Sequence, residues 1–185
     1  MNDPDNRDVL HPGHHSIRLI GADYSQPGLY LVTLCSFQRK CTFGTLVDSH
    51  VSLSGLGGIV NECWLQIPNH FSTVNLLDFV VMPNHLHGII EIGCQPGRCS
   101  AAPLRGEKPG VGVTPGSLGA IVRSVKSAVT RIAHTELQLD GEIWQRNYFE
   151  TILRPGVQLA NARAYIKENP QKWEWDRENP AAHMH

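Results

Sequence analysis

The sequence predicts an α+β fold in which helices pack on one face of a single antiparallel sheet. Apolar runs typical of strands and stretches with helical periodicity follow one another in the order β-α-β-β-α-β-α. The two consecutive strands in this order suit a hairpin, which is an antiparallel pair. The 185 residues, of which 41% are hydrophobic, are enough for one well-packed domain.

The first half of the chain supplies three predicted strands and one helix. A polar arm with several prolines comes first and covers residues 1–28. The helix is weakened by three glycines, and Pro83-Asn84 marks a tight turn between the last two strands. The predicted elements are a strand at 29–37, a helix at 48–67, and strands at 74–81 and 86–92.

The second half begins with a predicted flexible linker, because residues 93–116 contain six glycines and four prolines. Thr114 and Pro115 suit the N-cap and first position of a long amphipathic helix whose apolar stripe extends to Ile132. One domain over residues 29–180 is expected, followed by a short tail. The remaining predicted elements are an extended segment at 143–154, a helix at 156–168 that ends at Asn169-Pro170, and the tail at 181–185.

Composition narrows the class of protein. The formal net charge is −1, with four Lys/Arg against eight Asp/Glu in residues 1–97 and twelve against nine in residues 98–185. The second half is therefore the better candidate for binding a polyanion. No apolar run reaches the roughly 20 residues of a transmembrane helix, and the polar N-terminus is unlike a secretory signal. Five cysteines without a C-x-x-C pair favour reduced thiols, so we expect a cytoplasmic protein without a membrane partner.

The most informative motif is His85-Leu86-His87 at the start of a predicted strand. Because side chains alternate along a strand, both imidazoles lie on one face and Leu86 on the other. Two adjacent imidazoles can hold a divalent metal, although an arbitrary H-x-H pair more often binds nothing. A cysteine or histidine as third ligand would indicate zinc, whereas an amide or carboxylate oxygen would indicate Mg²⁺ or Mn²⁺.

Tyr165 and Asn169 are four residues apart on the predicted last helix and therefore lie on the same face of it. Tyr165 is at the margin of the apolar stripe, from which its hydroxyl can reach a cleft. Taken alone, such a tyrosine more often packs its ring and exposes its hydroxyl to water. An asparagine before proline can also simply end a helix. The residues alone leave both interpretations open.

Four segments together resemble the single-tyrosine HUH transposases, and more narrowly the IS200-like proteins associated with repetitive extragenic palindromes. The resemblance extends from about residue 29 to residue 180 and implies a ferredoxin-like core of the HUH endonuclease type. One departure is Thr151, where many relatives carry a histidine. The segments are residues 82–89, which contain the histidine pair, and residues 117–130, 144–150 and 164–170.

The resemblance implies an enzyme that cleaves and rejoins single-stranded DNA. His85, His87 and Asn169 would bind Mg²⁺ or Mn²⁺ at the scissile phosphate, and Tyr165 would be the nucleophile. The products would be a 5′-phosphotyrosine and a free 3′-OH, so a second 3′-OH can rejoin the strand without ATP. The other tyrosines lack a metal-capable residue four positions on along a helix: Tyr24, Tyr30 and Tyr148.

The expected partner is single-stranded or hairpin DNA, which would place the protein at the nucleoid. Relatives act either as monomers or as homodimers, and both remain open. Trp173 and Trp175 could stack on bases, but we expect them to fix the C-terminal segment to the core. Seven basic residues are candidate phosphate contacts: Arg123, Lys126, Arg131, Arg146, Arg154, Lys167 and Lys172.

Other functions fit parts of the same pattern. A relaxase or replication initiator of the HUH type is a close alternative, although one tyrosine and the small size favour a transposase. A domesticated DNA-binding module would keep these residues without a role in transposition. A zinc hydrolase would use His85, His87 and a cysteine, but the chain lacks a paired carboxylate motif.

Overall fold

The computed structural model describes residues 26–94, 115–176 and 179–180. Nearly all of the predicted arm and most of the predicted linker lie outside these residues. The elements in chain order are β1 (Gly28–Cys35), the 3₁₀ helix η2 (Phe37–Arg39), β2 (Gly44–Val47), β3 (His50–Leu53), α1 (Gly55–Leu65), α2 (Ile67–His70), β4 (Val74–Val81), β5 (His85–Ile92), α3 (Leu118–Glu136), β6 (Phe149–Leu153), α4 (Val157–Glu168) and the 3₁₀ helix η3 (Asn169–Trp175).

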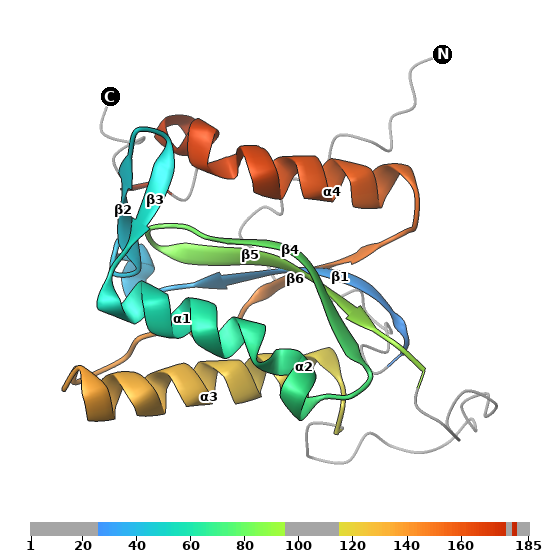
Figure 1. Ribbon diagram of the computed structural model, residues 1–185, viewed down its shortest axis with the longest axis horizontal. Coiled ribbons are helices and arrows are strands. Elements are labelled where there is room, and N and C mark those ends of the chain that lie inside the picture. Colours follow the sequence, from blue (N-terminus) through green and yellow to red (C-terminus); the bar gives the residue numbers. More distant parts are fainter. Residues whose placement is uncertain (1–25, 95–114, 177–178, 181–185) are drawn as a thin grey trace.

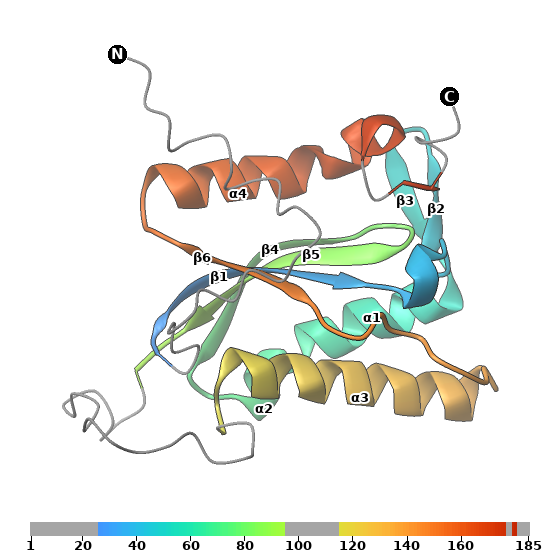
Figure 2. The same cartoon turned by 180° about the vertical axis from the view of Figure 1, so that it is seen from behind.

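The main sheet has the strand order β4-β5-β1-β6, and every neighbouring pair in it is antiparallel. α1, α2 and α3 cover one face of this sheet (Figure 1). The order β1-α1-β4-β5-α3-β6, with the helices on one face, is the ferredoxin-like arrangement, which confirms the predicted fold class. One element differs from the expectation, because α4 covers the opposite face of the sheet (Figure 2).

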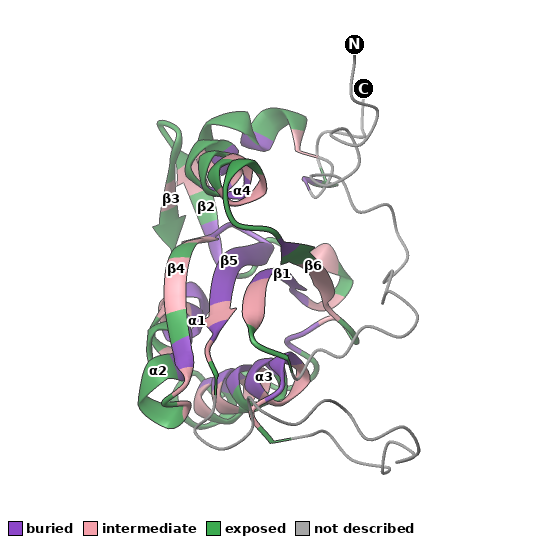
Figure 3. Ribbon diagram, turned by 90° about the vertical axis from the view of Figure 1, so that its right-hand side faces the viewer, coloured by how far each residue is buried: buried purple, intermediate pink, exposed green. Residues whose placement is uncertain are grey.

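The two faces of the sheet hold hydrophobic cores of different size. Side chains alternate along β1, so Tyr30, Val32 and Leu34 enter the larger core with α1 and α3. The smaller core lies under α4 and contains five buried residues: Leu31, Ile89, Leu153, Ala162 and Ile166. β5 runs between the two layers and is buried along almost its whole length (Figure 3).

The expectation of a helix over residues 48–67 is wrong at its beginning. That segment starts with strand β3, which pairs with β2 across a turn in which Asp48 and Ser49 have φ of 49° and 61°. This left-handed geometry is the one that closes a tight hairpin. The helix begins only after Ser54, whose side chain accepts a hydrogen bond of 3.0 Å from the Gly57 N–H. Helical spacing of a few apolar residues therefore concealed a short hairpin.

The start of α3 also differs from the expectation, whereas the predicted end of α4 at Glu168 is confirmed. The N-cap of α3 is Ser117, whose hydroxyl accepts a hydrogen bond of 3.3 Å from the Ala120 N–H, and Thr114 lies outside the described residues. Gly116 has φ of 76°, which excludes it from the helix. At the other end of the chain, Asn169-Pro170 ends α4 but does not end the helical path. Proline suits the first turn of a helix, and the chain continues as η3.

The cysteines and the hydropathy of the helices complete the description. Cys35, Cys41 and Cys63 are free thiols, whereas Cys94 is in a disulfide, so the expectation of reduced cysteines holds only in part.

Within the ranges that the structure describes, no helix combines the length and the apolar character needed to cross a bilayer.

Gly88 determines how closely α1 approaches β5. Trp64 of α1 is 1% exposed, and a Cβ at Gly88 would overlap its indole ring. Because Gly88 directly follows His87 in β5, this packing contact lies beneath the strand position that carries the histidine pair.

We predict that Gly88→Ala lowers the free energy of unfolding by about 1–3 kcal/mol, because a buried ring has to move. Gly58→Ala on α1 is the matched control, since a Cβ there meets nothing within 4 Å. Alanine is favoured over glycine in a helix by about 0.5–1 kcal/mol, so the control should be neutral or stabilising. Urea denaturation of both variants measures the difference, and equal effects would contradict the packing argument.

Candidate functional site

The histidine pair lies where β5 and β1 meet the C-terminal half of α4. In the antiparallel register, His85 is opposite Cys35 and His87 is opposite Thr33. Both imidazoles point to the face that α4 covers, are 0% and 5% exposed, and have ring centroids 4.4 Å apart. Leu86 between them enters the larger core on the other face, as the strand periodicity predicts.

Tyr165 and Asn169 approach the pair from α4. The Tyr165 hydroxyl lies 3.1 Å from His87 Nε2, and the two ring centroids are 5.1 Å apart. Asn169 follows one helical turn later and is 2% exposed. The structure therefore brings together all four residues that the sequence singled out, and it does so within one chain.

Asn84 and Thr33 orient the imidazoles through contacts to their Nδ1 atoms. The Asn84 side-chain amide donates a hydrogen bond of 2.9 Å to the Arg39 carbonyl, which turns its Oδ1 towards His85 Nδ1 at 2.8 Å. That nitrogen must then carry the proton, which leaves His85 Nε2 with its lone pair. Thr33 Oγ1 lies 2.7 Å from His87 Nδ1 and supports the same tautomer there. Hydrogen bonds of this kind commonly orient metal-binding histidines.

The inner atoms of the site fit a metal with mixed nitrogen and oxygen ligands. His85 Nε2 and Asn169 Oδ1 are buried and make no hydrogen bond within the described part of the chain. His87 Nε2 faces the same space and lies within hydrogen-bond distance of the Tyr165 hydroxyl. Two imidazole nitrogens and an amide oxygen are atoms that can ligate a divalent metal ion. No three His, Cys, Asp or Glu side chains gather at one place among the described residues, so the zinc hydrolase alternative lacks its third ligand there.

Burial sets the protonation states at the site. It lowers the pKa of His87 to about 3, and burial together with the neighbouring His87 and Arg39 lowers the pKa of His85. Burial raises the pKa of Tyr165 to about 12, the Asp176 carboxylate adds to this, and a hydrogen bond with the Asn169 side chain opposes it. At neutral pH both imidazoles are therefore neutral, and the phenol keeps its proton.

η3 forms the rim of the site. Trp173 is 7% exposed and its ring centroid lies 6.0 Å from that of His85, so it fixes the C-terminal segment as expected. Trp175 is 84% exposed, and the same expectation is wrong for it. Sequence reasoning gave no role to Thr33, Asn84 or Asp176. A signal existed for Asn84, which directly precedes the histidine motif, and for Thr33, a polar residue in an apolar strand.

The predicted phosphate contacts divide between the two layers. Lys126 is not free for a phosphate, because its ammonium donates to the Gln145 and Asn147 carbonyls at 2.8 and 2.6 Å. Lys172 pairs with Glu168 at 2.6 Å, and Lys167 and Arg154 are exposed. Three exposed arginines line a groove of about 650 Å³ between α3 and the segment before β6: Arg123, Arg131 and Arg146.

The competing tyrosines lie elsewhere. Tyr30 is 2% exposed in the larger core, and its hydroxyl donates to the Gln26 carbonyl at 2.7 Å. Tyr148 lines the arginine groove on the α3 side of the sheet. Tyr24 lies outside the described residues. Of the described tyrosines, only Tyr165 contacts the histidine pair.

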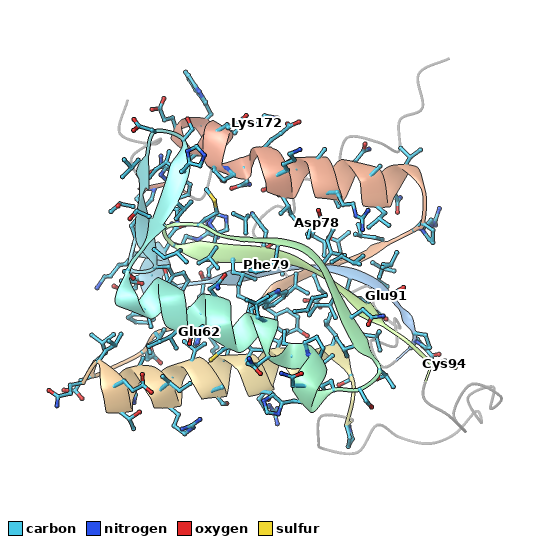
Figure 4. All side chains as sticks on the ribbon, viewed as in Figure 1. Glu62, Asp78, Phe79, Glu91, Cys94 and Lys172 are labelled. Carbon is cyan, nitrogen blue, oxygen red and sulfur yellow. The ribbon has the colours of Figure 1, made fainter. Side chains whose placement is uncertain are left out.

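An ion pair holds α4 across the edge of the sheet. Asp78 of β4 lies between that strand and α4 (Figure 4) and pairs with Arg163 at 2.9 Å. Both side chains are nearly half exposed, at 43% and 48%, so the pair adds only modest stability. With the small core beneath, it keeps the helix that carries Tyr165 next to β5.

Comparison with known proteins gives the family and supports the fold. An uncharacterized protein from Haemophilus influenzae is 39% identical over 168 residues, which cover 89% of this chain and 93% of that protein. The chain belongs to the same family. A solved structure of a REP-associated tyrosine transposase bound to a REP hairpin matches with a TM-score of 0.56 and 16% identity, covering 84% of this chain and 74% of that one. The chain thus shares its fold with that structure. No family model matches the chain.

The buried histidines predict acid sensitivity. The pKa of His87 is about 3 in the folded chain against 6.5 in a free histidine, so below pH 6.5 the unfolded state binds a proton that the folded state does not. We predict that the free energy of unfolding falls as the pH drops from 6.5 towards 3, and falls less steeply in His87→Gln. Urea unfolding at several pH values measures both slopes, and equal slopes would contradict this.

Proposed function

We propose that this protein cleaves and rejoins single-stranded DNA through a covalent bond between Tyr165 and a 5′ phosphate. The observation that carries the proposal is the contact of 3.1 Å between the Tyr165 hydroxyl and His87 Nε2. Around it lie two buried atoms, His85 Nε2 and Asn169 Oδ1, that need a further partner. A nucleophile beside a set of metal-ligating atoms is the arrangement that phosphoryl transfer with a tyrosine needs.

His85, His87 and Asn169 would hold Mg²⁺ or Mn²⁺. When bound, the ion would supply positive charge at a non-bridging oxygen of the scissile phosphate. Neutral imidazoles are required for this role, and the lowered pKa values of both histidines keep them neutral. Asn84 and Thr33 hold the rings so that both Nε2 atoms face the site.

Tyr165 carries the chemical step. Its phenol loses the proton, its oxygen forms a bond to phosphorus, and the bond from phosphorus to the 3′ oxygen breaks. The 3′ oxygen takes up a proton and leaves as a free 3′-OH. Attack of another 3′-OH on the phosphotyrosine reverses these steps and restores the tyrosine. Because the phosphodiester bond energy is kept in the intermediate, no nucleotide cofactor is required.

The partner that we propose is single-stranded or hairpin DNA. The solved transposase that shares this fold is bound to a REP hairpin, which supports DNA as the partner. Tyr165 and the histidine pair meet within one chain, so a second copy is not needed to complete the site. This geometry favours action as a monomer over a homodimer that exchanges its tyrosine helices.

The arginine groove is the proposed surface for the DNA backbone beyond the cleavage site. It lies on the α3 side of the sheet, whereas Tyr165 lies on the α4 side. The two are joined at one end of β1, where the Gln145 N–H donates to the Cys35 carbonyl at 2.9 Å and Cys35 is opposite His85. A strand held in the groove therefore reaches the histidines around this end of the sheet.

We predict a denaturation-resistant adduct when the protein is incubated with labelled hairpin DNA and Mg²⁺ or Mn²⁺. Tyr165→Phe should abolish the adduct, because the ring stays and the nucleophilic oxygen is lost. His85→Ala and Asn169→Ala should abolish metal-dependent cleavage, which gel electrophoresis under denaturing conditions measures. Tyr30→Phe is the matched control and should form the adduct at the wild-type rate, because Tyr30 lies in the larger core, away from the histidine pair and the arginine groove.

Two results would contradict this function. An adduct that persists in Tyr165→Phe would exclude the proposed nucleophile. Salt-sensitive DNA binding without cleavage under either metal would favour the DNA-binding module, the alternative that keeps the same surface without the reaction.

We also predict that Arg123→Ala and Arg146→Ala each reduce the salt dependence of DNA binding. Removing one phosphate contact should lower the slope of log K against log salt by about 0.7–0.9. Lys126→Ala should act differently and lower the unfolding midpoint, because two carbonyls lose their donor. Fluorescence anisotropy at several salt concentrations and thermal unfolding separate these effects. An unchanged slope in both arginine variants would exclude the groove.

A further inference from the structure

Trp175 is unlike the other three tryptophans of the chain. Trp64, Trp144 and Trp173 are 1%, 9% and 7% exposed, whereas Trp175 is 84% exposed. An indole is large and mostly apolar, and tryptophans are highly buried on average. The Trp175 side chain therefore gains little burial energy on folding, and it is not packed into either core of the described residues.

The indole stands at the rim of the site described above. A 3₁₀ helix has three residues per turn, so residues two apart in η3 point to different sides. Trp173 points inward against the His85 ring, and Trp175 points outward. The next residue is Asp176, whose carboxylate acts on the Tyr165 phenol. Trp175 thus stands between Trp173, which packs against the His85 ring, and Asp176, whose charge raises the pKa of Tyr165.

We propose that Trp175 is a stacking platform for a base of the single-stranded DNA next to the scissile phosphate. The inference rests on the proposed cleavage of DNA and adds a binding contact to it. Every base presents an aromatic face, so an exposed indole can hold the strand without reading its sequence. Strand β3 lies against η3 (Figure 1), so the β2–β3 hairpin is next to the helix that carries Trp175.

Intrinsic fluorescence tests the platform directly. An oligothymidylate of about 12 nucleotides is titrated into the protein without added metal, so that binding is separated from cleavage. Because three of the four indoles are buried, we expect most of the quenching from Trp175, and Trp175→Ala measures the contribution of Trp144, which lines the arginine groove. An abasic oligonucleotide of the same length keeps the phosphates and removes the bases.

Three variants give the comparison. Trp175→Ala should weaken the dissociation constant for oligothymidylate about 5- to 100-fold and remove most of the quenching. Trp175→Phe should lose most of the quenching and keep the affinity within about 3-fold, because a ring remains. Val157→Ala is the matched control, since Val157 is 70% exposed at the far end of α4. All three should unfold at the wild-type midpoint, because only exposed side chains change.

Wild-type affinity in Trp175→Ala would overturn the platform, and so would equal affinity of the wild type for the abasic and the base-containing strand. The Tyr165 adduct is measured in parallel at saturating DNA. Base-dependent binding without an adduct in the wild type would refute the cleavage and leave the stacking supported. An adduct together with base-independent binding would refute the stacking alone.

Discussion

The register of β5 against β1 is the constraint on which the rest of the molecule depends. It places His87 opposite Thr33 and His85 opposite Cys35, and it fixes which side chains of β5 face α4. A shift by one residue would turn both imidazoles into the larger core and Leu86 towards Tyr165. Gly88 holds this register from the other side, because Trp64 packs where a side chain would stand. The packing of Trp64 against Gly88 on the α1 side of the sheet therefore fixes the positions of the two histidines on the α4 side.

The site shows how a buried polar group is prepared for a ligand. Each imidazole has one nitrogen fixed by a neighbour and one turned to the same space. Leaving His85 Nε2 and Asn169 Oδ1 without hydrogen bonds costs free energy in the isolated chain. That cost is offset when a ligand takes those positions, so orientation is established by folding and not by binding. The outer hydrogen bonds are thus as much part of the site as the atoms that face it.

The sequence predicted the placement of side chains correctly in elements whose residues follow a single periodicity, either that of a strand or that of a helix. Alternation along β5 predicted the common face of His85 and His87, and the four-residue spacing placed Tyr165 and Asn169 together on α4. It was misleading where short elements meet, because Val51 fits a helical stripe and also a four-residue strand. That α4 crosses to the opposite face depends on a pairing between β1 and β6 that no local pattern contains. The sequence likewise could not predict that the Lys126 ammonium is already hydrogen-bonded, because its acceptors are two backbone carbonyls of a distant segment.

The unequal cores give the two layers different resistance to local opening. The α1 and α3 layer shares 22 buried residues with the sheet, whereas the layer under α4 shares five. Local unfolding follows the amount of buried apolar contact, so we expect the amide protons of α4 to exchange sooner than those of α1 and α3. Such an opening separates Tyr165 from His87 while the sheet and its other layer stay intact. Tyr165, the proposed nucleophile, thus lies on a helix that we expect to separate from the sheet more easily than α1 or α3 does.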